Sequence, residues 1–300
     1  MFFPAARRRF AALLITVFLA WAHPGCSNGQ GESFLEKGQG VEQARPAMIV
    51  AHRGVNKFAP ENTMPAIELA IRMGLDYVEI DVRTSRDGQM VLMHNEVVDG
   101  TTDGSGLVRD LTAGQIRDLD AGSWFSEEFA GTRVPLLEEA LETMRGRIGA
   151  YVDVKDADPS RLLEVLRRTG MLGASVLYAD PLTHLAMRGL DPDAKVMPEV
   201  GDNDFLFEFM LFLLHPGVVA VSWGNPTGPF IDRIQAEGIQ VFMDVLGETD
   251  TPEGMRAALD LGVDAMQTDN PDILLEVMRE WAANQPAGAG FRGGKAPGGS

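Results

Sequence analysis

Residues 77–82 read Tyr-Val-Glu-Ile-Asp-Val, and this stretch contains the pattern that decides the fold. Side chains alternate between the two faces of a strand, so Glu79 and Asp81 project to one face and the aliphatic residues project to the other. The same spacing recurs at Asp153 and Lys155. In a parallel barrel the chemistry lies at the carboxyl ends of the strands, and both charged pairs lie at predicted strand ends.

Strand and helix patterns alternate along the rest of the chain. Strands are expected at Met48–Ala51, Tyr77–Val82, Met90–Met93, Ala150–Val154, Ser175–Tyr178, Ala194–Met197, Val218–Val221, Gln240–Met243 and Ala265–Thr268. Helices are expected at Thr63–Met73, Pro159–Arg168, Pro181–Arg188, Pro229–Glu237, Pro252–Leu261 and Pro271–Ala282, the first capped by Asn62 or Thr63. The count of strand–helix units predicts an α/β fold, a (β/α)₈ TIM barrel, with a small insertion after the second strand region.

The N-terminus is typical of an export signal. Arg7–Arg9 precede an apolar run over residues 10–22, which is shorter than the ~20 residues that span a bilayer. Cys26 lies in a Gly-Cys-Ser sequence similar to a lipoprotein cleavage site, and the sequence leaves open whether it is acylated. We expect an exported protein, periplasmic or a cell-envelope lipoprotein, with membrane attachment only through an acylated Cys26. The expected divisions are a signal at 1–26, a linker at 27–46, the barrel at 47–283 and a disordered tail at 284–300.

Composition excludes several classes of protein. The chain has 300 residues and a formal net charge of −17, which argues against binding to nucleic acid. Its single cysteine excludes an intramolecular disulfide and a cysteine-rich zinc site. The strongly apolar run Phe205–Leu214 is too short to span a membrane, so we expect a buried barrel helix there.

The ionisable residues at the predicted strand ends indicate phosphoryl chemistry. Glu79 and Asp81 on one face repel each other unless a cation or a proton lies between them. An oxygen-ligated Mg²⁺ or Ca²⁺ is the simplest resolution. Asp153 is a candidate third ligand. The alternative for these residues is a set of structural ion pairs inside the barrel.

Two histidines and two cations complete this candidate site. His52 and His94 follow predicted strands, and a pair of imidazoles can divide the two proton transfers of a hydrolysis between them. Arg53 and Lys155 suit phosphate oxygens. The remaining histidines are interpreted as structural or surface residues.

Several motifs together carry a family resemblance. They are Ala51-His52-Arg53-Gly54, Pro60-Glu61-Asn62-Thr63, Glu79-Ile80-Asp81-Val82, His94, and the segments 100–106, 119–125, 135–141 and 267–272. This combination resembles the glycerophosphodiester phosphodiesterase family over residues 47–280. A lone His-Arg-Gly would be a weak signal, whereas the set is specific.

The resemblance implies a metal-containing (β/α)₈ barrel that hydrolyses small-molecule glycerophosphodiesters to glycerol 3-phosphate and an alcohol. Carried over by position, it implies catalytic His52 and His94, phosphate-binding Arg53 and Lys155, metal ligands Glu79, Asp81 and Asp153 for Ca²⁺ or Mg²⁺, and supporting Glu61 and Asn62. In this assignment His52 activates a nucleophile, either water or the 2-hydroxyl of the substrate. His94 protonates the leaving alkoxide.

The sequence departs from the family pattern at four places. Asn95 replaces a usual aspartate after the second histidine, and Asp153 replaces a usual glutamate. Gly100 replaces a common arginine, and Met243–Leu246 replace a common Trp-Thr-Val-Asn. None of these changes removes a histidine or the pair on the second strand. We therefore expect retained activity with altered specificity.

Two other functions stay open from the sequence. The first is a phospholipase D-like lyase acting on lysophospholipids or sphingolipids, for which Trp124, Phe125 and Trp223 are rim candidates, although core packing is the favoured interpretation of each. The second is a non-catalytic barrel that binds its ligand, which Asn95 keeps open. The run Asp99–Asp110 is interpreted as a turn rather than a calcium loop. The leaving alcohol is also open among choline, ethanolamine, inositol and glycerol.

Overall fold

The computed structural model describes residues 45–201, 204–224 and 227–286. The predicted export signal with Cys26, nearly all of the predicted linker and most of the predicted tail lie outside the described residues. The described chain contains no helix that is both long enough and apolar enough to cross a bilayer.

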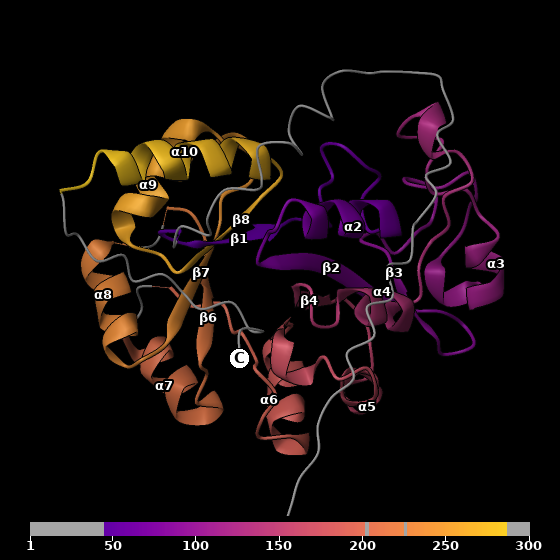
Figure 1. Cartoon of the computed structure of the whole chain (residues 1–300). Helices are drawn as coiled ribbons and strands as arrows, with labels where there is room; N and C mark the ends of the chain where they lie inside the picture. Colours follow the sequence, from indigo (N-terminus) through magenta and orange to yellow (C-terminus); the bar gives the residue numbers. More distant parts are fainter. Residues whose placement is uncertain (1–44, 202–203, 225–226, 287–300) are drawn as a thin grey trace, which may run out of the picture. The chain divides into compact units, whose positions relative to one another are not determined.

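Among the described residues, the strands form one eight-stranded sheet that curls into a barrel (Figure 1). The strands are β1 Met48–Ala51, β2 Tyr77–Thr84, β3 Met90–Leu92, β4 Gly149–Val154, β5 Ser175–Tyr178, β6 Val218–Val221, β7 Gln240–Asp244 and β8 Ala265–Thr268. Their order is β5-β4-β2-β1-β8-β7-β6, and β3 pairs with β2. The seven strands of this path are parallel, and β1 pairs directly with β8. The predicted barrel class is therefore confirmed.

Residues 195–200 bridge the remaining gap between β5 and β6. On one side the Met197 N–H donates to the Leu177 carbonyl at 2.8 Å, and on the other the Val200 N–H donates to the Ala220 carbonyl at 2.9 Å. The bridges on both sides are parallel. This segment completes the barrel between β5 and β6, in the position where a further strand would lie.

The regular strand predicted at Ala194–Met197 is wrong. The segment makes only isolated bridges to its neighbours. Pro198 has no N–H to donate, and a proline in a central strand position interrupts the ladder of hydrogen bonds. The barrel is consequently built from seven regular strands and one irregular connection.

Helices follow the barrel strands and cover their outer face (Figure 1). They are α2 Met64–Arg72, α4 Leu137–Met144, α5 Pro159–Arg168, α6 Pro181–Leu190, α7 Asp204–Leu214, α8 Gly228–Ala236, α9 Pro252–Leu261 and α10 Pro271–Ala283, with the short α3 Ala113–Arg117 in the insertion. Each helix that the sequence predicts ends within two residues of the predicted bounds. Asp158 and Asp180 cap α5 and α6 by accepting backbone N–H bonds in the first turn.

Two apolar cores separate the faces of the barrel strands. The outer core lies between strands and helices and contains Ile80, while the inner core contains Tyr77 and Tyr151. Because side chains alternate, the inward direction of Tyr77 and Tyr151 continues two residues later at Glu79 and Asp153. Strand packing thus aims the acidic residues into the mouth of the barrel.

The insertion between β3 and α4 has a small core of its own. Val98, Val108, Ile116 and Val134 are buried together there. The β3 strand joins this region to the barrel by pairing antiparallel with β2. The predicted insertion is confirmed, and within it Asp99 Oδ1 accepts a hydrogen bond from the Gly106 backbone N–H at 3.1 Å.

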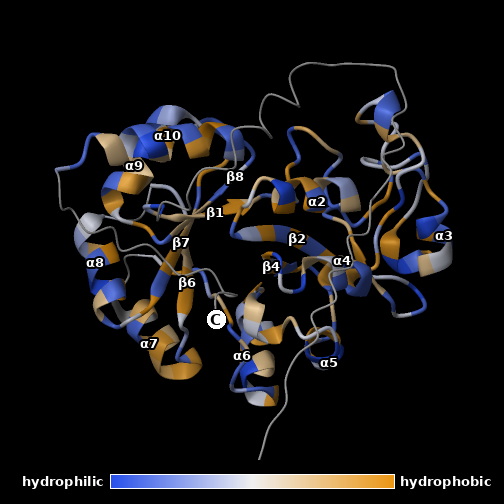
Figure 2. Cartoon of the chain, viewed as in Figure 1, coloured by the Kyte–Doolittle hydropathy of each residue, from blue (hydrophilic) through white to orange (hydrophobic). Residues whose placement is uncertain are grey.

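Helix α7 is less buried than its sequence indicates. Phe207 packs edge-on against Phe230 at 5.5 Å and is buried. Phe209 and Phe212, however, are 47% and 73% exposed. Figure 2 shows the apolar colouring of this helix reaching its outer surface. The expectation of a buried helix holds for one face only, because a helix on the outside of a barrel can bury only the stripe that faces the strands.

Candidate functional site

Three carboxylates gather at the carboxyl ends of β2 and β4. Asp81 and Asp153 are direct partners in the parallel register, and Glu79 precedes them on the inward face. One oxygen from each of the three lies within 4.8 Å of the others. Glu79 and Asp81 are 2% and 1% exposed. The structure therefore brings together the residues that the strand spacing predicted as ligands.

The electrostatics of this cluster call for a cation. Burial raises the pKa of Glu79 well above its ordinary value, and the nearby carboxylates of Asp81 and Asp153 raise it further. Burial likewise raises the pKa of Asp153, against the lowering effect of Lys155. An all-carboxylate donor set is the kind that hard divalent cations prefer. The residues present thus fit a bound Ca²⁺ or Mg²⁺.

Lys155 already supplies part of the positive charge. Its Nζ lies 2.7 Å from Asp153 Oδ2 and 3.1 Å from Asp81 Oδ1. Burial disfavours the ammonium form, but the two carboxylates outweigh that effect and raise the pKa of Lys155. Together with Arg53, whose Nε lies 3.4 Å from Asp81 Oδ2, Lys155 supplies two positive charges against three acids, so a negative charge remains that a cation would compensate.

Arg53 is fixed above the same cluster by its backbone and its side chain. The backbone is left-handed, with φ of 54°, and its N–H donates to Glu79 at 2.7 Å. The guanidinium Nη1 donates to Glu61 at 3.0 Å. Nε is buried and makes no hydrogen bond among the described residues, although it lies 3.4 Å from Asp81 Oδ2. Arg53 therefore contacts both Glu61 and the candidate metal ligand Asp81.

Asn62 differs from its predicted role as a helix cap. Its Nδ2 donates to Asp81 Oδ2 at 2.7 Å, and its Oδ1 accepts the Asp81 backbone N–H at 3.1 Å. The cap position of α2 is Thr63, whose hydroxyl donates instead to the Pro60 carbonyl. The left-handed φ of 55° turns the Asn62 side chain away from the helix and toward β2. Asn62 therefore orients a candidate metal ligand.

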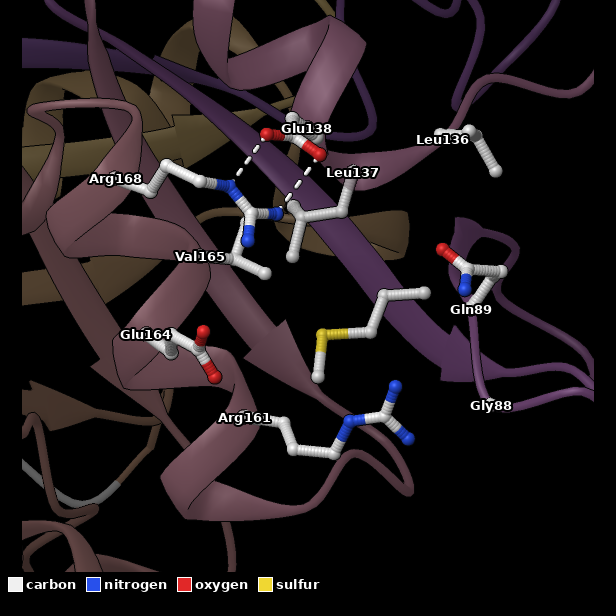
Figure 3. Close-up of a pocket in the computed structure, with 10 residues that line it drawn as sticks. Gly88, Gln89, Leu136, Leu137, Glu138, Arg161, Glu164, Val165 and Arg168 are labelled. Carbon is white, nitrogen blue, oxygen red and sulfur yellow. Dashed lines mark hydrogen bonds and ion pairs between the residues drawn. The ribbon is translucent and has the colours of Figure 1, made fainter.

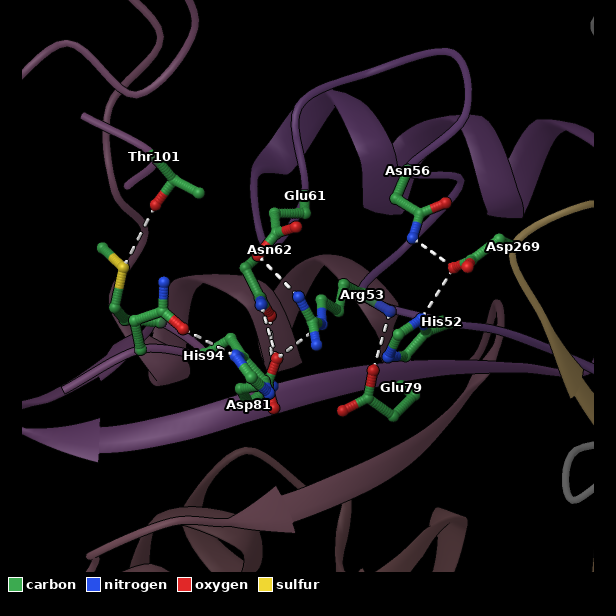
Figure 4. Close-up of polar contacts among 12 residues, drawn as sticks. His52, Arg53, Asn56, Glu61, Asn62, Glu79, Asp81, His94, Thr101 and Asp269 are labelled. Carbon is green, nitrogen blue, oxygen red and sulfur yellow. Dashed lines mark hydrogen bonds and ion pairs between the residues drawn. The ribbon is translucent and has the colours of Figure 1, made fainter. Parts of the chain in front are cut away.

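His52 is held by a residue that the sequence reasoning did not assign. Its Nδ1 lies 2.7 Å from Asp269 Oδ1, and Asn56 Nδ2 donates to the same oxygen (Figure 4). Asp250 in turn accepts the Asp269 backbone N–H at 2.8 Å. A signal was available, because a closed barrel places the ends of its first and last strands side by side, and Asp269 directly follows β8.

His94 reaches the site from β3. Its Nδ1 lies 2.9 Å from Asn95 Oδ1, and Arg83 holds its carbonyl oxygen with two donors at 2.9 and 2.8 Å. Both candidate histidines therefore engage a side-chain oxygen through Nδ1, which fixes the ring and leaves Nε2 for a substrate. Figure 4 shows His94 on the side of Asp81 and His52 on the side of Glu79.

The aromatic rim candidates are more exposed than expected. Trp124 and Trp223 are 45% and 39% exposed, so the preference for core packing is wrong for both. Trp124 stands on the insertion, where its ring meets Phe125 edge-on at 5.7 Å. Phe125 continues the contact to Phe129. Trp124 thus belongs to a surface aromatic group of the insertion.

A cavity of about 230 Å³ lies outside the barrel mouth, between β3, α4 and α5 (Figure 3). Its charged residues include Arg168 and Glu138, which form a bidentate ion pair: Arg168 Nε and Nη2 donate to the two Glu138 carboxylate oxygens at 2.7 and 2.8 Å. The lining contains no histidine and none of the three clustered carboxylates. Both candidate histidines and the three clustered carboxylates lie instead at the barrel mouth, which is the candidate active site.

Comparison with known proteins gives consistent relatives. The model of the glycerophosphoryl diester phosphodiesterase family matches residues 52–171. A glycerophosphodiester phosphodiesterase of Bacillus altitudinis is 39% identical over 250 residues, which cover 77% of this chain and 98% of the relative.

Two solved structures share the fold. A glycerophosphodiester phosphodiesterase from Agrobacterium tumefaciens matches with a TM-score of 0.70 and 31% identity, over 77% of this chain and 99% of its own. A phosphodiesterase from Oleispira antarctica, solved in complex with the product sn-glycerol-3-phosphate, matches with a TM-score of 0.70 and 25% identity, over 77% of this chain and 96% of its own.

Proposed function

The chain belongs to the glycerophosphoryl diester phosphodiesterase family, and on that premise we propose that it is an exported, metal-dependent enzyme that uses His52 and His94 for acid–base catalysis. Family membership makes it a phosphoric diester hydrolase that acts on glycerophosphodiesters. One observation supports the finer mechanism. Two histidines, each oriented through Nδ1, flank a cluster of three carboxylates at one end of the barrel.

Glu79, Asp81 and Asp153 would hold the divalent cation, Ca²⁺ or Mg²⁺. When bound, such an ion acts as a Lewis acid on phosphate oxygens and compensates their negative charge. Asn62 fixes Asp81 through two hydrogen bonds, and the Arg53 N–H fixes Glu79. These supporting contacts keep the carboxylates aimed at one point.

Arg53 and Lys155 would contact the phosphate of the diester. Arg53 Nε lies 3.4 Å from Asp81 Oδ2, and Lys155 lies beside both Asp81 and Asp153, so both cations are at the candidate metal ligands. Cations beside a transferring phosphoryl group stabilise the negative charge that builds up on its oxygens. The product complex of the Oleispira relative supports glycerol 3-phosphate as the product here.

His52 would accept the proton of the nucleophile at Nε2 as a new P–O bond forms. The Asp269 carboxylate at Nδ1 compensates the positive charge that the ring then carries. His94 would donate a proton from Nε2 to the leaving alkoxide as its P–O bond breaks. The nucleophile is water, or the 2-hydroxyl of the glycerol, in which case a cyclic phosphate forms first and water opens it.

Export rests on the sequence of the first 26 residues, with basic residues before an apolar run. Cell fractionation of the full chain tests it, and labelling with a fatty acid tests acylation of Cys26. A protein that stays in the cytosolic fraction with its N-terminus intact would contradict this part of the proposal.

Turnover by histidine variants tests the catalytic part. Glycerol 3-phosphate release from glycerophosphocholine should fall by about 10²-fold or more in His52→Ala and in His94→Ala. His215→Asn is the matched control, because His215 is exposed at the end of α7. Near-normal turnover in a folded His52→Ala variant would remove His52 from the mechanism. Detection of a cyclic phosphate by ³¹P NMR would identify the 2-hydroxyl as the nucleophile.

A further inference from the structure

Asp244 is an acid at the mouth of the barrel that the mechanism above does not use. It ends β7, two residues after Phe242 of the inner core, so its side chain points to the inside of the barrel. Its carboxylate has no hydrogen-bond or ion-pair partner among the described residues. Burial raises its pKa to about 6; His52 opposes this rise, and Glu199 and Asp153 add to it. The position belongs to the segment that departs from the family pattern.

Glu199 is a second acid on this side of the mouth, and its position is fixed. The Tyr178 hydroxyl donates to Glu199 Oε2 at 2.9 Å, and the Ser222 hydroxyl donates to Oε1. Both donors are neutral hydroxyl groups, so these two contacts orient Glu199 without placing a cation beside it. Glu199 is exposed.

Gln267 adds an independent sign that a ligand group is missing here. It is the register partner of Asp244 on the neighbouring β8 and follows the inner-core residue Ala265 by two positions, so it shares the inward face. It is 6% exposed, and its Oε1 has no hydrogen-bond partner among the described residues. A buried amide oxygen without a donor is costly unless a ligand or water supplies one.

The two sides of the mouth differ in how their acids are neutralised. On the β1–β4 side, Arg53 and Lys155 contact carboxylates. On the other side, the inward residues at the ends of β5, β6, β7 and the 195–200 segment are Tyr178, Ser222, Asp244 and Glu199. This set contains no cation. A substrate whose phosphate lies at Glu79, Asp81 and Asp153 would therefore extend toward Asp244 and Glu199.

We propose that Asp244 and Glu199 select diesters whose leaving alcohol carries an ammonium group, such as choline or ethanolamine, over diesters of neutral alcohols. The inference rests on the proposed function, because it places the diester phosphate at Glu79, Asp81 and Asp153. It assigns specificity to two residues that the acid–base mechanism leaves without a role.

An ammonium group on the leaving alcohol complements Asp244 and Glu199 better than a hydroxyl group does. A hydroxyl can donate one bond to a carboxylate, but it does not compensate two negative charges that raise each other's energy. An ammonium group compensates the charge of Asp244, and the ring of Tyr178 beside it offers a favourable aromatic face. A primary ammonium also supplies the donor that the buried oxygen of Gln267 lacks.

Specificity ratios test the proposal. The full chain with its metal is assayed for glycerol 3-phosphate release from glycerophosphocholine and glycerophosphoethanolamine, and from glycerophosphoglycerol and glycerophosphoinositol. The wild type should favour the two cationic diesters in kcat/KM. In Asp244→Asn and in Glu199→Gln, the ratio of kcat/KM for cationic to neutral diesters should fall about tenfold, with the change mostly in KM. Glu253→Gln, which removes an equally negative but 83% exposed side chain from α9, should leave the ratio unchanged.

Each other outcome overturns a defined part of this reasoning. An equal loss on all four diesters would mean that the acids bind the glycerol moiety, and the selectivity proposal would be wrong. A wild type that hydrolyses all four without preference would also overturn the proposal while leaving the proposed function intact. No release from any diester by the folded, metal-loaded chain would overturn the proposed function and this inference with it.

Discussion

Removing the negative charge that holds His52 should slow turnover by a definable amount. The change is Asp269→Asn, which keeps the shape of the side chain. Asn56 donates to Asp269 Oδ1, the same oxygen that faces His52 Nδ1 at 2.7 Å. That donor keeps an oxygen, and not an NH₂ group, turned toward the ring. The variant therefore preserves the orientation of His52 and loses mainly the charge.

The magnitude follows from Coulomb's law at a partly exposed site. The Asp269 side chain is 38% exposed, so the effective dielectric constant is high, about 40. A carboxylate whose charge lies about 4 Å from that of an imidazolium then contributes about 2 kcal/mol. That value corresponds to about a 30-fold loss in kcat. Asp269→Ala also loses the orientation and should lose more, about 10²-fold to 10³-fold.

The assay is metal-loaded release of glycerol 3-phosphate with kcat and KM measured separately. The expected result is a lower kcat with little change in KM, because in the proposed mechanism Asp269 acts through His52. Asp272→Asn is the matched control, since Asp272 lies in the first turn of α10 and binds Lys57 Nζ instead. Unchanged kcat in Asp269→Asn, or an equal loss in the control, would refute a positioning role for Asp269.

Three further changes test other parts of the structure. Asn62→Ala removes both hydrogen bonds to Asp81. It should lower the free energy of unfolding, measured by urea unfolding, by about 1–3 kcal/mol, and metal affinity, measured by titration, by about 10- to 100-fold. Unchanged metal affinity would mean that Asp81 does not need the support of Asn62. Asp244→Asn should stabilise the protein by about 1–3 kcal/mol at pH 8. Burial raises the pKa of Asp244 in the folded state to about 6 from 3.8, so the wild type loses stability as pH rises from 4 to 6, whereas the variant does not. Parallel pH profiles of melting temperature for the two proteins would contradict that cause. Gly54→Ala places a Cβ 2.6 Å from the Ala66 Cβ at a φ of 82° and should cost about 2–4 kcal/mol, a loss that thermal unfolding would detect.

Most of the barrel was predictable because its strands carry a local signal. Apolar runs bounded by turn residues predict β1, β5, β6 and β8 with their observed ends. The exception is Ala194–Met197, where an apolar run exists but Pro198 prevents a continuous ladder of hydrogen bonds. Local periodicity indicates which side chains are apolar, whereas pairing also depends on the neighbouring strands.

The cluster of acids was predictable for the same reason. Alternation alone places Glu79 and Asp81 on one face, and parallel register then brings Asp153 opposite Asp81. The supporting contacts were not predictable from local pattern. Asn62 has the sequence context of a helix cap, and only a positive φ together with a partner 19 residues away turns it onto Asp81.

The partner of His52 illustrates the same limit over a longer distance. Asp269 is 217 residues away in sequence, and its segment was recognised as a motif without a role. The topology of a closed barrel carries the missing information, since β1 and β8 are neighbours. Asp244 shows the same limit. The sequence marks it only as part of a departure from the family motif, and its role can be interpreted only once its neighbours at the barrel mouth are known.

A metal titration coupled to turnover tests the central claim most directly. The full chain is treated with chelator and titrated with Ca²⁺ or Mg²⁺ while glycerol 3-phosphate release from glycerophosphocholine is followed, with Glu79→Ala in parallel. We predict no release without metal, a plateau at one ion per chain, and neither tight metal binding nor release in Glu79→Ala. Full release in the presence of chelator, or undiminished release by Glu79→Ala, would contradict a catalytic metal held by Glu79, Asp81 and Asp153.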